Sequence, residues 1–464
     1  MSGGMINPSR LLIVSHDVVG SRMAGPGIRY WKMARAMSDR LEVTLAAPGH
    51  APMGEGFITA TYTPGGWETL ASLVAQADAL LFSGDLLAIF PRLADCGKPL
   101  VLDVYDPHTF ETVHLSVALP PAEQVTAYMA RVDILRRTAL AGDFFICATQ
   151  RQRDYWLGIL DVCGRANAFN YSADPTLQSL IDLVPFGLPS QPPQANGSPI
   201  KGQAPGIEAG DRVILWGGGL WEWLDPLTLV RAVGRLCDRY ANLRLVFFSG
   251  RHPNPGVPDM PMRTRAMARS DELGLTNKSV FFIDRWVPHQ DWPAYLLDAD
   301  IGASLHLDTL ETRFAFRTRV VDYIWAGLPM VVTGGDETSD LVAHHNLGAV
   351  VPPGDVDAVV AAVAQLLDIV DLRKHYQPAF ECVRPLFEWK RVCEPIVRFC
   401  QSPRLAPDRA AGVIAQELGD TRELHQALAE REAEAQRLHG LVEGYERGKF
   451  IRAMRWLGHL RKEG

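Results

Sequence analysis

The chain has 464 residues, of which 47% are hydrophobic and 21% are charged, and its formal net charge is −7 at pH 7. That length suggests two or three globular domains, and the slightly acidic balance gives no reason to expect nucleic acid as a partner. The seven cysteines are scattered and include no CxxC pair. They favour a reducing compartment, and we predict no metal site.

The first ten residues, MSGGMINPSR, lack the apolar core of a signal peptide. The apolar run at residues 11–15 is too short to cross a bilayer, so we expect a cytoplasmic protein. This run predicts a strand, and the glycine-rich loop and helical pattern after it predict the opening unit of a doubly wound sheet. Gly20, Gly25 and Gly27 do not have the G-x-G-x-x-G spacing, so no nicotinamide or flavin cofactor is expected.

Further apolar runs alternate with helical patterns, which favours a parallel α/β domain. They predict strands at residues 43–46, 79–82, 100–104 and 144–147. Asp103, Tyr105, Asp106 and His108 follow the third of these, at the edge where α/β sheets place ligand-binding residues. The pair Asp106 and Pro107 is also compatible with an ordinary turn.

Residues 189–210 are rich in Pro, Gly, Ser and Gln, which predicts a linker. A second α/β run follows, with strands predicted at residues 213–216, 243–249, 280–283, 301–304 and 330–332. The predicted fold is therefore α/β: two tandem Rossmann-like, doubly wound domains with a cleft between them, and a helical C-terminal extension.

Gly217, Gly218 and Gly219 lie directly after the first strand of the second run and before a predicted helix. Three glycines at such a turn permit close approach of the backbone to a phosphate. The loop lacks the Gly-Lys-Ser/Thr ending of a P-loop, so it does not indicate an NTPase. A tight strand-to-helix turn with no ligand is the alternative.

Charged residues concentrate between residues 310 and 335. Arg317, Thr318 and Arg319 precede an amphipathic run that ends at Ala-Gly-x-Pro, where a helix is expected to stop. Two guanidinium groups and the free N–H groups of a helix start form an anion-binding arrangement. Asp322 follows within two turns, and a carboxylate can accept two hydrogen bonds from a diol. The segment predicts a site for the diphosphate and ribose of a nucleotide; a helix with solvated or paired charges is the alternative.

Beyond about residue 403 the pattern is helical. Apolar residues spaced by three and four form a short heptad seam, interrupted by Arg431, which fits a coiled coil or a helix packed on the body equally well. Residues 445–464 set apolar side chains and Trp456 against lysines and arginines, a pattern suited to an anionic membrane surface. A tail bound to an acidic partner or to the protein itself is the alternative.

Several stretches, in this order, resemble the GT-B glycosyltransferases, specifically the large retaining family numbered 4. RTRVVDYIWAGLPMVV resembles the signature of that family's C-terminal domain. DLVPFGLP resembles the strand that closes its N-terminal domain, and GDFFICATQRQRDYW the strand and helix before that. GPGIRYWKMARAM resembles the opening loop and helix of many bacterial members. The resemblance covers about residues 10–400.

This resemblance implies transfer of a sugar from a nucleotide-sugar donor to an acceptor, with the anomeric configuration retained and with no bound metal or cofactor. The donor would lie mainly against the C-terminal domain and the acceptor against the N-terminal one. Asp322 matches the second acid of the family's motif and would bind the ribose diol, and Arg319 matches the basic residue that contacts the diphosphate. The other donor-binding residues that we predict are Gly217, Gly218, Gly219, Arg285, Arg317 and Thr318.

By the same resemblance, Asp106 and His108 would orient the donor sugar or the acceptor. The acceptor-binding residues predicted in the opening loop and helix are Gly25, Gly27 and Arg29. The family motif's first acid falls on Phe314 in this sequence. We therefore expect Glu311, the nearest acid, to contact the donor sugar from a longer loop.

Two further differences from the family concern the length of one acidic side chain and the number of basic residues. Asp322 is one methylene shorter than the usual glutamate. Residues 220–226 contain no base where the family carries an arginine and a lysine. We therefore expect the phosphate charge to fall more heavily on Arg317 and Arg319, with Arg285 as a third cation.

We predict an enzyme, a glycosyltransferase of the hexosyltransferase type with a role in polysaccharide biosynthesis. The predicted segments are an acceptor domain (1–190), a linker (191–210), a donor domain (211–385), a return helix (386–402) and a helical tail (403–464). The expected partners are a nucleotide sugar, a glycan or lipid-linked acceptor, an anionic membrane surface and a coiled-coil mate. The expected location is cytoplasmic, either free or peripheral on the inner face of the membrane. The alternatives are a non-catalytic GT-B module that binds nucleotide or glycan, and a nucleotide-sugar epimerase.

Overall fold

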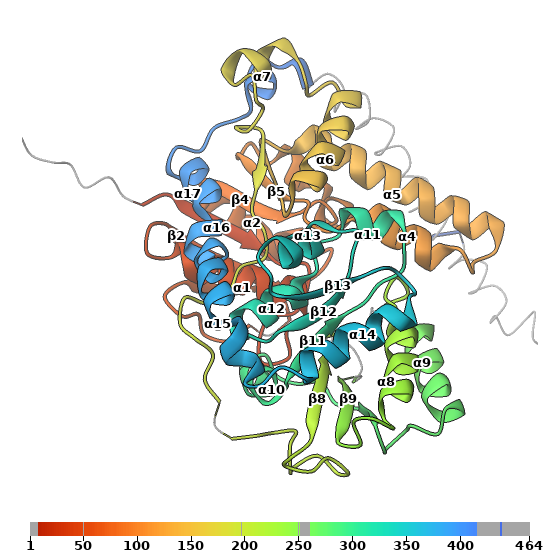
Figure 1. Cartoon of the computed structure of the whole chain (residues 1–464). Helices are drawn as coiled ribbons and strands as arrows, with labels where there is room; N and C mark the ends of the chain where they lie inside the picture. Colours follow the sequence, from red (N-terminus) through yellow and green to blue (C-terminus); the bar gives the residue numbers. More distant parts are fainter. Residues whose placement is uncertain are drawn as a thin grey trace, which may run out of the picture. The chain divides into compact units, whose positions relative to one another are not determined.

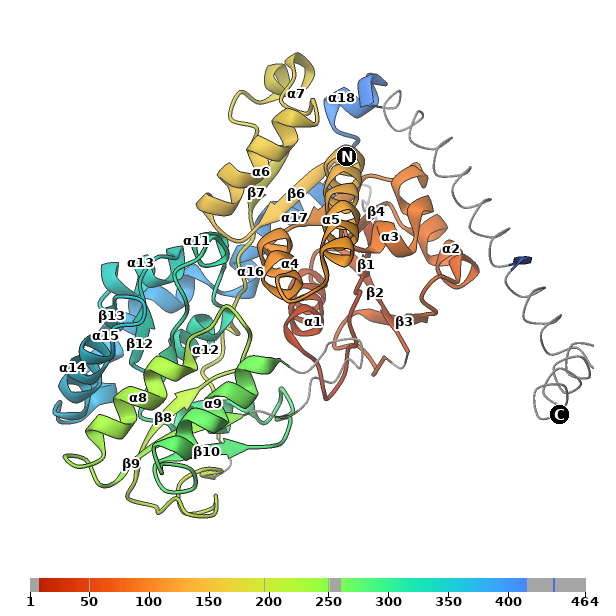
Figure 2. The same ribbon diagram turned by 90° about the vertical axis from the view of Figure 1, so that its right-hand side faces the viewer.

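The computed structural model describes residues 8–49, 51–195, 197–248, 250, 260–414 and 437–438. Residues 1–406 form one compact unit and residues 407–464 a second. The first unit contains two separate parallel β-sheets flanked by helices (Figure 1). Figure 2 separates them by colour, with the N-terminal sheet in red to yellow and the second sheet in green to blue.

The first sheet has seven strands in the order β3-β2-β1-β4-β5-β6-β7. Its strands are β1 (Arg10–Val14), β2 (Glu42–Pro48), β3 (Ile58–Tyr62), β4 (Ala79–Ser83), β5 (Leu100–Asp103), β6 (Phe144–Cys147) and β7 (Ile181–Leu183). Its helices are α1 (Gly25–Met37), α2 (Trp67–Gln76), α3 (Leu86–Ile89), α4 (His108–Ser116), α5 (Pro121–Ala141), α6 (Gln150–Val162) and α7 (Ala168–Ala173), with a 3-10 turn at Pro91–Asp95. Every residue of β4 is buried, as expected for a parallel strand covered on both faces.

The second sheet has six strands in the order β10-β9-β8-β11-β12-β13. Its strands are β8 (Arg212–Trp216), β9 (Leu243–Phe248), β10 (Val280–Ile283), β11 (Ile301–Ser304), β12 (Met330–Thr333) and β13 (Gly348–Val351). The helices are α8 (Pro226–Leu236), α9 (Pro261–Glu272), α10 (Trp292–Asp298), α11 (Leu310–Phe314), α12 (Thr318–Ala326), α13 (Glu337–His344), α14 (Val356–Leu367) and α15 (Leu372–Val383).

After α15 and a 3-10 turn (Arg384–Leu386), the chain returns to the first domain. α16 (Trp389–Val392) and α17 (Glu394–Gln401) follow there, and α18 (Pro407–Ala410) begins the second unit. Trp389 and Ile396 belong to the same buried apolar cluster as Leu11 in β1. Ile200 and Ile207, within the predicted linker, are buried in the core of the second sheet. The linker segment is therefore anchored on the second domain.

Each sheet reverses its strand order next to its first strand, between β1 and β4 and between β8 and β11. In open α/β sheets, ligands bind in the crevice beyond the carboxyl ends of the strands at such a point. In the second sheet, the turn after β8 lies at this reversal point. In the first sheet, the segment after β5 lies one strand away from the reversal point, since β5 neighbours β4.

The predicted fold class is confirmed: two Rossmann-like parallel sheets, together with C-terminal helices. The ten predicted strands are present, whereas β3, β7 and β13 were not among the strands located by apolar runs. The heptad seam and the basic amphipathic segment lie outside the described residues, apart from residues 437–438. Within the described ranges, no helix combines the length and hydropathy needed to cross a bilayer.

Candidate functional site

The turn after β8 is tied to α12 by hydrogen bonds and close packing. The Gly217 N–H donates to Tyr323 Oη at 2.9 Å, and Arg319 Nη2 donates to the Gly219 carbonyl at 3.3 Å. Gly218 has a φ of +92°, which favours glycine. A Cβ atom at Gly218 would lie 3.7 Å from Arg319 Nη2. The three glycines thus bring the backbone and one arginine to the same place.

Arg319 is the second residue of α12. Its guanidinium lies 5.0 Å from the centre of the Trp216 ring, a cation–π arrangement. Burial lowers the pKa of Arg319 to about 10, so the group is still charged at neutral pH. Its Nη1 is buried and has no hydrogen-bond partner among the described residues. A buried cation with an unused donor, next to a glycine turn, is suited to bind an anion.

Asp322 follows one turn later on α12 and accepts a hydrogen bond from Trp292 Nε1 at 3.1 Å. Burial raises the pKa of Asp322 to about 7, although the Trp292 hydrogen bond and the Arg319 charge oppose this effect. The helix begins at Thr318 and ends at Gly327 in the left-handed conformation. The predicted helix start and stop are therefore where the sequence placed them.

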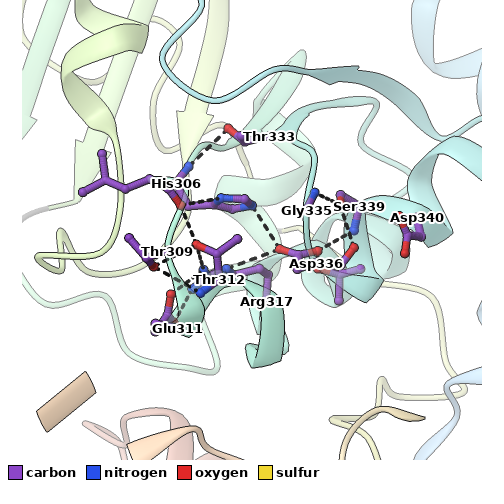
Figure 3. A network of polar contacts seen from close by, with 12 residues as sticks. His306, Thr309, Glu311, Thr312, Arg317, Thr333, Gly335, Asp336, Ser339 and Asp340 are labelled. Carbon is purple, nitrogen blue, oxygen red and sulfur yellow. Dashed lines mark hydrogen bonds and ion pairs between the residues drawn. The ribbon is translucent and has the colours of Figure 1, made fainter. Parts of the chain in front are cut away.

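A second group of charges, Glu311, Arg317, Asp336 and His306, is almost completely buried and includes the N-cap of this helix, Arg317 (Figure 3). Arg317 Nη1 and Nη2 donate to the Glu311 carboxylate at 2.9 and 2.8 Å. Arg317 Nε lies 3.5 Å from Asp336 Oδ2, and His306 Nε2 lies 3.1 Å from the same oxygen. Asp336 also caps α13 by accepting from the Ser339 N–H.

This ion-pair network changes the roles predicted for two residues. Arg317 directs its guanidinium at carboxylates, so a phosphate would have to compete with Glu311 for it. Glu311 in turn keeps 1% of its surface exposed and uses both oxygens for Arg317. Burial raises the pKa of Glu311, and the Arg317 charge counteracts this. Arg317 and Glu311 together support the start of α12, where Thr318 and Arg319 lie.

On the N-terminal domain, Asp106 and His108 lie where β5 leads into α4. His108 Nε2 is 3.3 Å from Asp85 Oδ2, and His108 Nδ1 is 3.4 Å from Glu111 Oε2. Burial alone would lower the pKa of His108, but the carboxylates of Asp85, Glu111 and Asp106 raise it to about 10. Burial raises the pKa of Asp106 to about 7. A cavity beside β4 and β5 is lined by residues that include Asp85, Asp106, His108, Arg131 and Tyr155.

The prediction that Arg29 binds the acceptor is not supported. Its guanidinium is fully buried and paired with Asp103 at 2.7 and 3.0 Å, and it also donates to the carbonyls of Val184 and Pro185. These contacts use its donors to join α1, β5 and the segment after β7. Gly27 has a packing role, because a Cβ atom there would lie 2.3 Å from the Val18 carbonyl oxygen.

Two other predicted residues lie on more open surfaces. Gly25 begins α1, and a Cβ atom there would meet nothing within 4 Å. Arg285 is exposed in the turn after β10, where its guanidinium lies over the Tyr295 ring and donates to Tyr295 Oη. Both remain predictions as ligand contacts. Among the described residues, no group of three or more His, Cys, Asp or Glu side chains has the arrangement of a metal site.

Comparison with known proteins bears on the domain that contains Gly217 and Arg319. Residues 211–368 match the family model described as glycosyl transferases group 1. The chain carries a group 1 glycosyltransferase domain. A search of curated protein sequences finds no match.

Solved structures extend the similarity over the two sheets. Sucrose-phosphate synthase from Thermosynechococcus elongatus superimposes with a TM-score of 0.60 at 16% identity, over 84% of this chain and 98% of that one. HepE from Anabaena, solved with UDP-glucose, gives 0.59 at 15% identity over 85% and 99%. Trehalose 6-phosphate synthase from Burkholderia multivorans gives 0.61 at 12% identity over 85% and 98%. These similarities show that the two sheets have the GT-B fold.

Three residues of the site were not selected from the sequence. Tyr323 Oη donates to the carbonyls of Leu215 and Ala303, so it fixes the glycine turn to β8 and β11. Trp292 holds Asp322, as described above. Lys32, on α1 of the first domain, lies within electrostatic range of Asp322 on α12 of the second domain. Sequence patterns give no signal for such pairings, because the partners are far apart along the chain.

The glycosyltransferase domain is joined to the N-terminal domain at the start of α6. The Glu337 carboxylate accepts hydrogen bonds from the Gln150 and Arg151 N–H groups at 3.2 and 3.1 Å. Arg151 also donates to the Gly335 carbonyl at 2.8 Å and to Asp340 at 2.5 Å. Glu337 therefore caps the free amides of a helix that belongs to the other sheet.

We expect Glu337→Ala to loosen this junction while both domains remain folded. The Gln150 and Arg151 amides should exchange with solvent about tenfold faster or more, because hydrogen bonds to a charged group contribute about 1.5–3 kcal/mol. Hydrogen exchange read by mass spectrometry measures this directly. Asp340→Ala, which removes only an exposed partner of Arg151, should change exchange little. Unchanged exchange in Glu337→Ala would show that the cap does not hold the junction.

Proposed function

We propose that the protein is a retaining glycosyltransferase that moves a hexose from a nucleoside-diphosphate sugar to a glycan or lipid-linked acceptor. The observation that carries this proposal is the meeting of three features beyond β8. The glycine turn contacts Arg319 on α12, the Nη1 of Arg319 has no partner among the described residues, and Asp322 follows Arg319 by one helical turn. Together they provide an anion site next to a diol acceptor.

In the proposed reaction, the bond between the sugar's anomeric carbon and the diphosphate oxygen breaks, and a bond to the acceptor oxygen forms on the same face. The acceptor hydroxyl proton passes to the departing diphosphate. Negative charge therefore grows on the diphosphate in the transition state. Arg319 and the N–H groups at the start of α12 would stabilise this charge in a site with little water.

The sugar would lie between the acids of the two domains. Glu111, which touches His108, acts electrostatically on both Glu311 and Arg317. Glu111 thus brings the group that includes Asp106 and His108 within electrostatic range of the buried network. We infer that they orient the hydroxyl groups of donor or acceptor, with His108 acting as a cation because its pKa is about 10.

Lys32 supports the same assignment from the other side of the site. It makes no hydrogen bond or ion pair with the described part of the chain. Burial lowers its pKa, and the charges of Glu55 and then Asp322 oppose this effect. Burial and the Lys32 charge also lower the pKa of His289 to about 4. Lys32 could therefore supply part of the positive charge that is missing from residues 220–226.

Ribose binding by Asp322 predicts a pH dependence. The raised pKa of about 7 means that the free carboxyl is protonated below pH 7 and ionised above it. Because the ionised form accepts two hydrogen bonds from a diol, affinity for UDP should fall by up to about tenfold per pH unit below pH 7. Calorimetry from pH 6 to pH 8 measures it. In Asp322→Asn, the UDP affinity should still change with pH through the titration of UDP itself, but the part due to Asp322 should be lost. If the affinities of the wild type and of Asp322→Asn change with pH in the same way, Asp322 is not the group that titrates.

A non-catalytic module is the second candidate, and one observation favours it. Phe314, at the position of the family's first acid, packs against Phe110 at 5.4 Å and Tyr155 at 5.1 Å between ring centres. That position is thus used for contact between the domains, where the family uses it for a sugar. The structure would then bind a nucleotide or glycan without transferring it.

One experiment separates the candidates. The full chain is screened with nucleoside diphosphates and nucleotide sugars by thermal shift, starting with UDP-glucose, because HepE was solved with that ligand. A ligand that binds only the folded state raises the melting temperature. The stabilising donor is then incubated with glycan and lipid-linked acceptors, and the anomeric configuration of the product is read by NMR. Stabilisation without transfer supports the non-catalytic module, and conversion of the donor in the absence of an acceptor indicates an epimerase. If no ligand stabilises the protein, both the glycosyltransferase and the non-catalytic module are contradicted.

A further inference from the structure

A single side chain, that of Gln152 in the first turn of α6, is hydrogen-bonded to both domains. It is 2% exposed, and its Nε2 donates to the Tyr105 carbonyl at 2.6 Å and to the Phe314 carbonyl at 2.7 Å. Its Oε1 accepts from the Ala148 N–H at 2.7 Å. A side-chain amide has two N–H donors. Both donors of Gln152 are therefore used, one for each domain.

The sequence at the start of α6 explains why the amide reaches outward. Thr149 is the N-cap of α6 and accepts from the Gln152 N–H. A glutamine three residues after such a cap commonly turns its side chain back toward the N-cap N–H. Here only the oxygen turns back, to the N–H of Ala148, one residue before the cap. The NH2 group is therefore left to donate to other segments.

The two carbonyls belong to segments that carry residues of the proposed site. Tyr105 directly precedes Asp106 in the first domain. Phe314 is the last residue of α11, which also contains Glu311, in the second domain. In both views α11 lies beside α4 and α6 (Figures 1 and 2). Gln152 thus connects the backbone next to Asp106 with the backbone of the helix that carries Glu311.

Aromatic rings pack around this connection. The Phe314 ring lies 5.4 Å from that of Phe110 on α4 and 5.1 Å from that of Tyr155, one turn after Gln152 on α6. Tyr105, whose carbonyl is one of the two acceptors, is buried. In such surroundings water does not readily replace a donor that is lost, and an unpaired carbonyl is unfavourable. The separation of the two segments therefore depends on the amide of Gln152.

We propose that Gln152 is a positioning residue for the glycosyl transfer proposed above, on which this inference rests. It holds the Asp106 segment and α11 at one separation, so that groups from both domains act on the same sugar. The proposed nucleotide contacts, namely the glycine turn, Arg319 and Asp322, all lie in the second domain. Gln152 therefore affects turnover more than it affects binding of the donor.

Gln152→Glu tests this assignment, because it keeps the shape of the side chain and the oxygen that accepts from Ala148. An ionised carboxylate offers neither carbonyl a donor, whereas a protonated one has a single O–H donor. Relative to the wild type at the same pH, we expect the turnover number to fall at least about tenfold at pH 8. Since burial raises the pKa of a carboxyl group, the turnover number should recover at least about threefold by pH 6. The Michaelis constant for the donor should change less than about twofold.

The full chain is assayed by release of UDP from UDP-glucose with the glycan and lipid-linked acceptors, or with the nucleotide sugar that stabilises the chain most in the thermal-shift screen. Asp106, His108 and Glu111 titrate in every variant, so the ratio to the wild type isolates residue 152. Gln152→Met also lacks the donors but cannot ionise, so its loss of turnover should be the same at pH 6 and pH 8.

Gln124→Glu is the matched control. The Gln124 amide also donates to two carbonyls, those of Val117 and Leu119, but near the surface and within the first domain. Its turnover should equal that of the wild type at both pH values. Hydrogen exchange read by mass spectrometry gives a readout without turnover. Residues 105–110 and 310–317 should exchange faster in Gln152→Glu than in the wild type at pH 8, and at the wild-type rate in Gln124→Glu.

The outcomes separate this assignment from the proposed function. Wild-type turnover in Gln152→Glu at pH 8, or a loss that is the same at both pH values, would overturn the role of Gln152 and leave the proposed transfer intact. A wild type that transfers no sugar from any donor contradicts the proposed function itself. Faster exchange in Gln152→Glu would then show a contact between the domains that has no part in transfer.

Discussion

Replacing Arg319 with alanine is expected to lower the turnover number of sugar transfer by about a hundredfold to a thousandfold while the protein stays folded. Removal of one preorganised donor to a developing negative charge typically costs about 2.7–4 kcal/mol in the transition state. Arg319 is suited to this role because its Nη1 has no partner among the described residues and its guanidinium is fixed over Trp216. Steady-state kinetics with the donor identified by thermal shift measures the effect.

Two further variants make the Arg319 result specific. Arg319→Lys keeps the charge but loses the planar fork, so it should recover only part of the activity. Arg235→Ala removes an arginine from the exposed pair with Asp357 and should leave turnover unchanged. Circular dichroism confirms that each variant is folded. Near wild-type turnover in Arg319→Ala would remove this residue from the mechanism.

Replacing Arg317 with methionine is expected to destabilise the protein by about 3–5 kcal/mol, the usual cost of leaving one member of a buried ion pair without its partner. Glu311 and Asp336 would then be buried acids with no cation between them. Since about 1 kcal/mol shifts the melting temperature of a domain of this size by about 2–4 °C, we expect a fall of about 10 °C. Calorimetry measures the transition.

The double variant Glu311→Gln/Arg317→Met separates charge from packing. It removes both members of the Arg317–Glu311 pair and should recover part of the lost stability, because Glu311 no longer leaves a buried charge, whereas Asp336 still loses its Arg317 contact. Arg235→Met serves as a surface control and should cost less than about 1 kcal/mol, since its partner Asp357 is exposed. A double variant as unstable as Arg317→Met would mean that the loss comes from packing or from the Asp336 contact, and not from an unpaired Glu311 charge.

Arg319→Ala and Arg317→Met both change α12 or its cap, and this helix links the candidate site to the rest of the domain. Its N-cap, Arg317, belongs to the buried network, its second residue faces the glycine turn, and Tyr323 on the same helix holds that turn. Gly302 allows this arrangement, because a Cβ atom there would lie 2.7 Å from the Tyr323 ring. A single helix therefore carries the proposed phosphate contact, the proposed ribose contact and the support for both.

Apolar runs located ten strands, namely the nine that lie inside a sheet and the edge strand β10, because a parallel strand covered on both faces must be apolar along its length. The three strands that they missed, β3, β7 and β13, all lie at sheet edges, and β7 has only three residues. β3 (Ile58–Tyr62) is half exposed, and β13 (Gly348–Val351) begins with a glycine and is only partly buried. Less burial at an edge leaves a weaker apolar pattern.

Local sequence also placed the glycine turn after β8 and the helix α12 (Thr318–Ala326) with its cap at Gly327, since a backbone turn and a helix stop depend on neighbouring residues. Partners of charged groups depend on contacts between distant segments. Arg29 is paired with Asp103, 74 residues away, and Arg317 with Glu311 and Asp336. Only the folded chain showed that these two arginines are used in the interior and that Arg319 Nη1 has no partner within the described ranges. The sequence by itself determined the two sheets and the turn and helix of the candidate site, because burial and turn chemistry are local. The tertiary structure decided which charges remain available to a ligand.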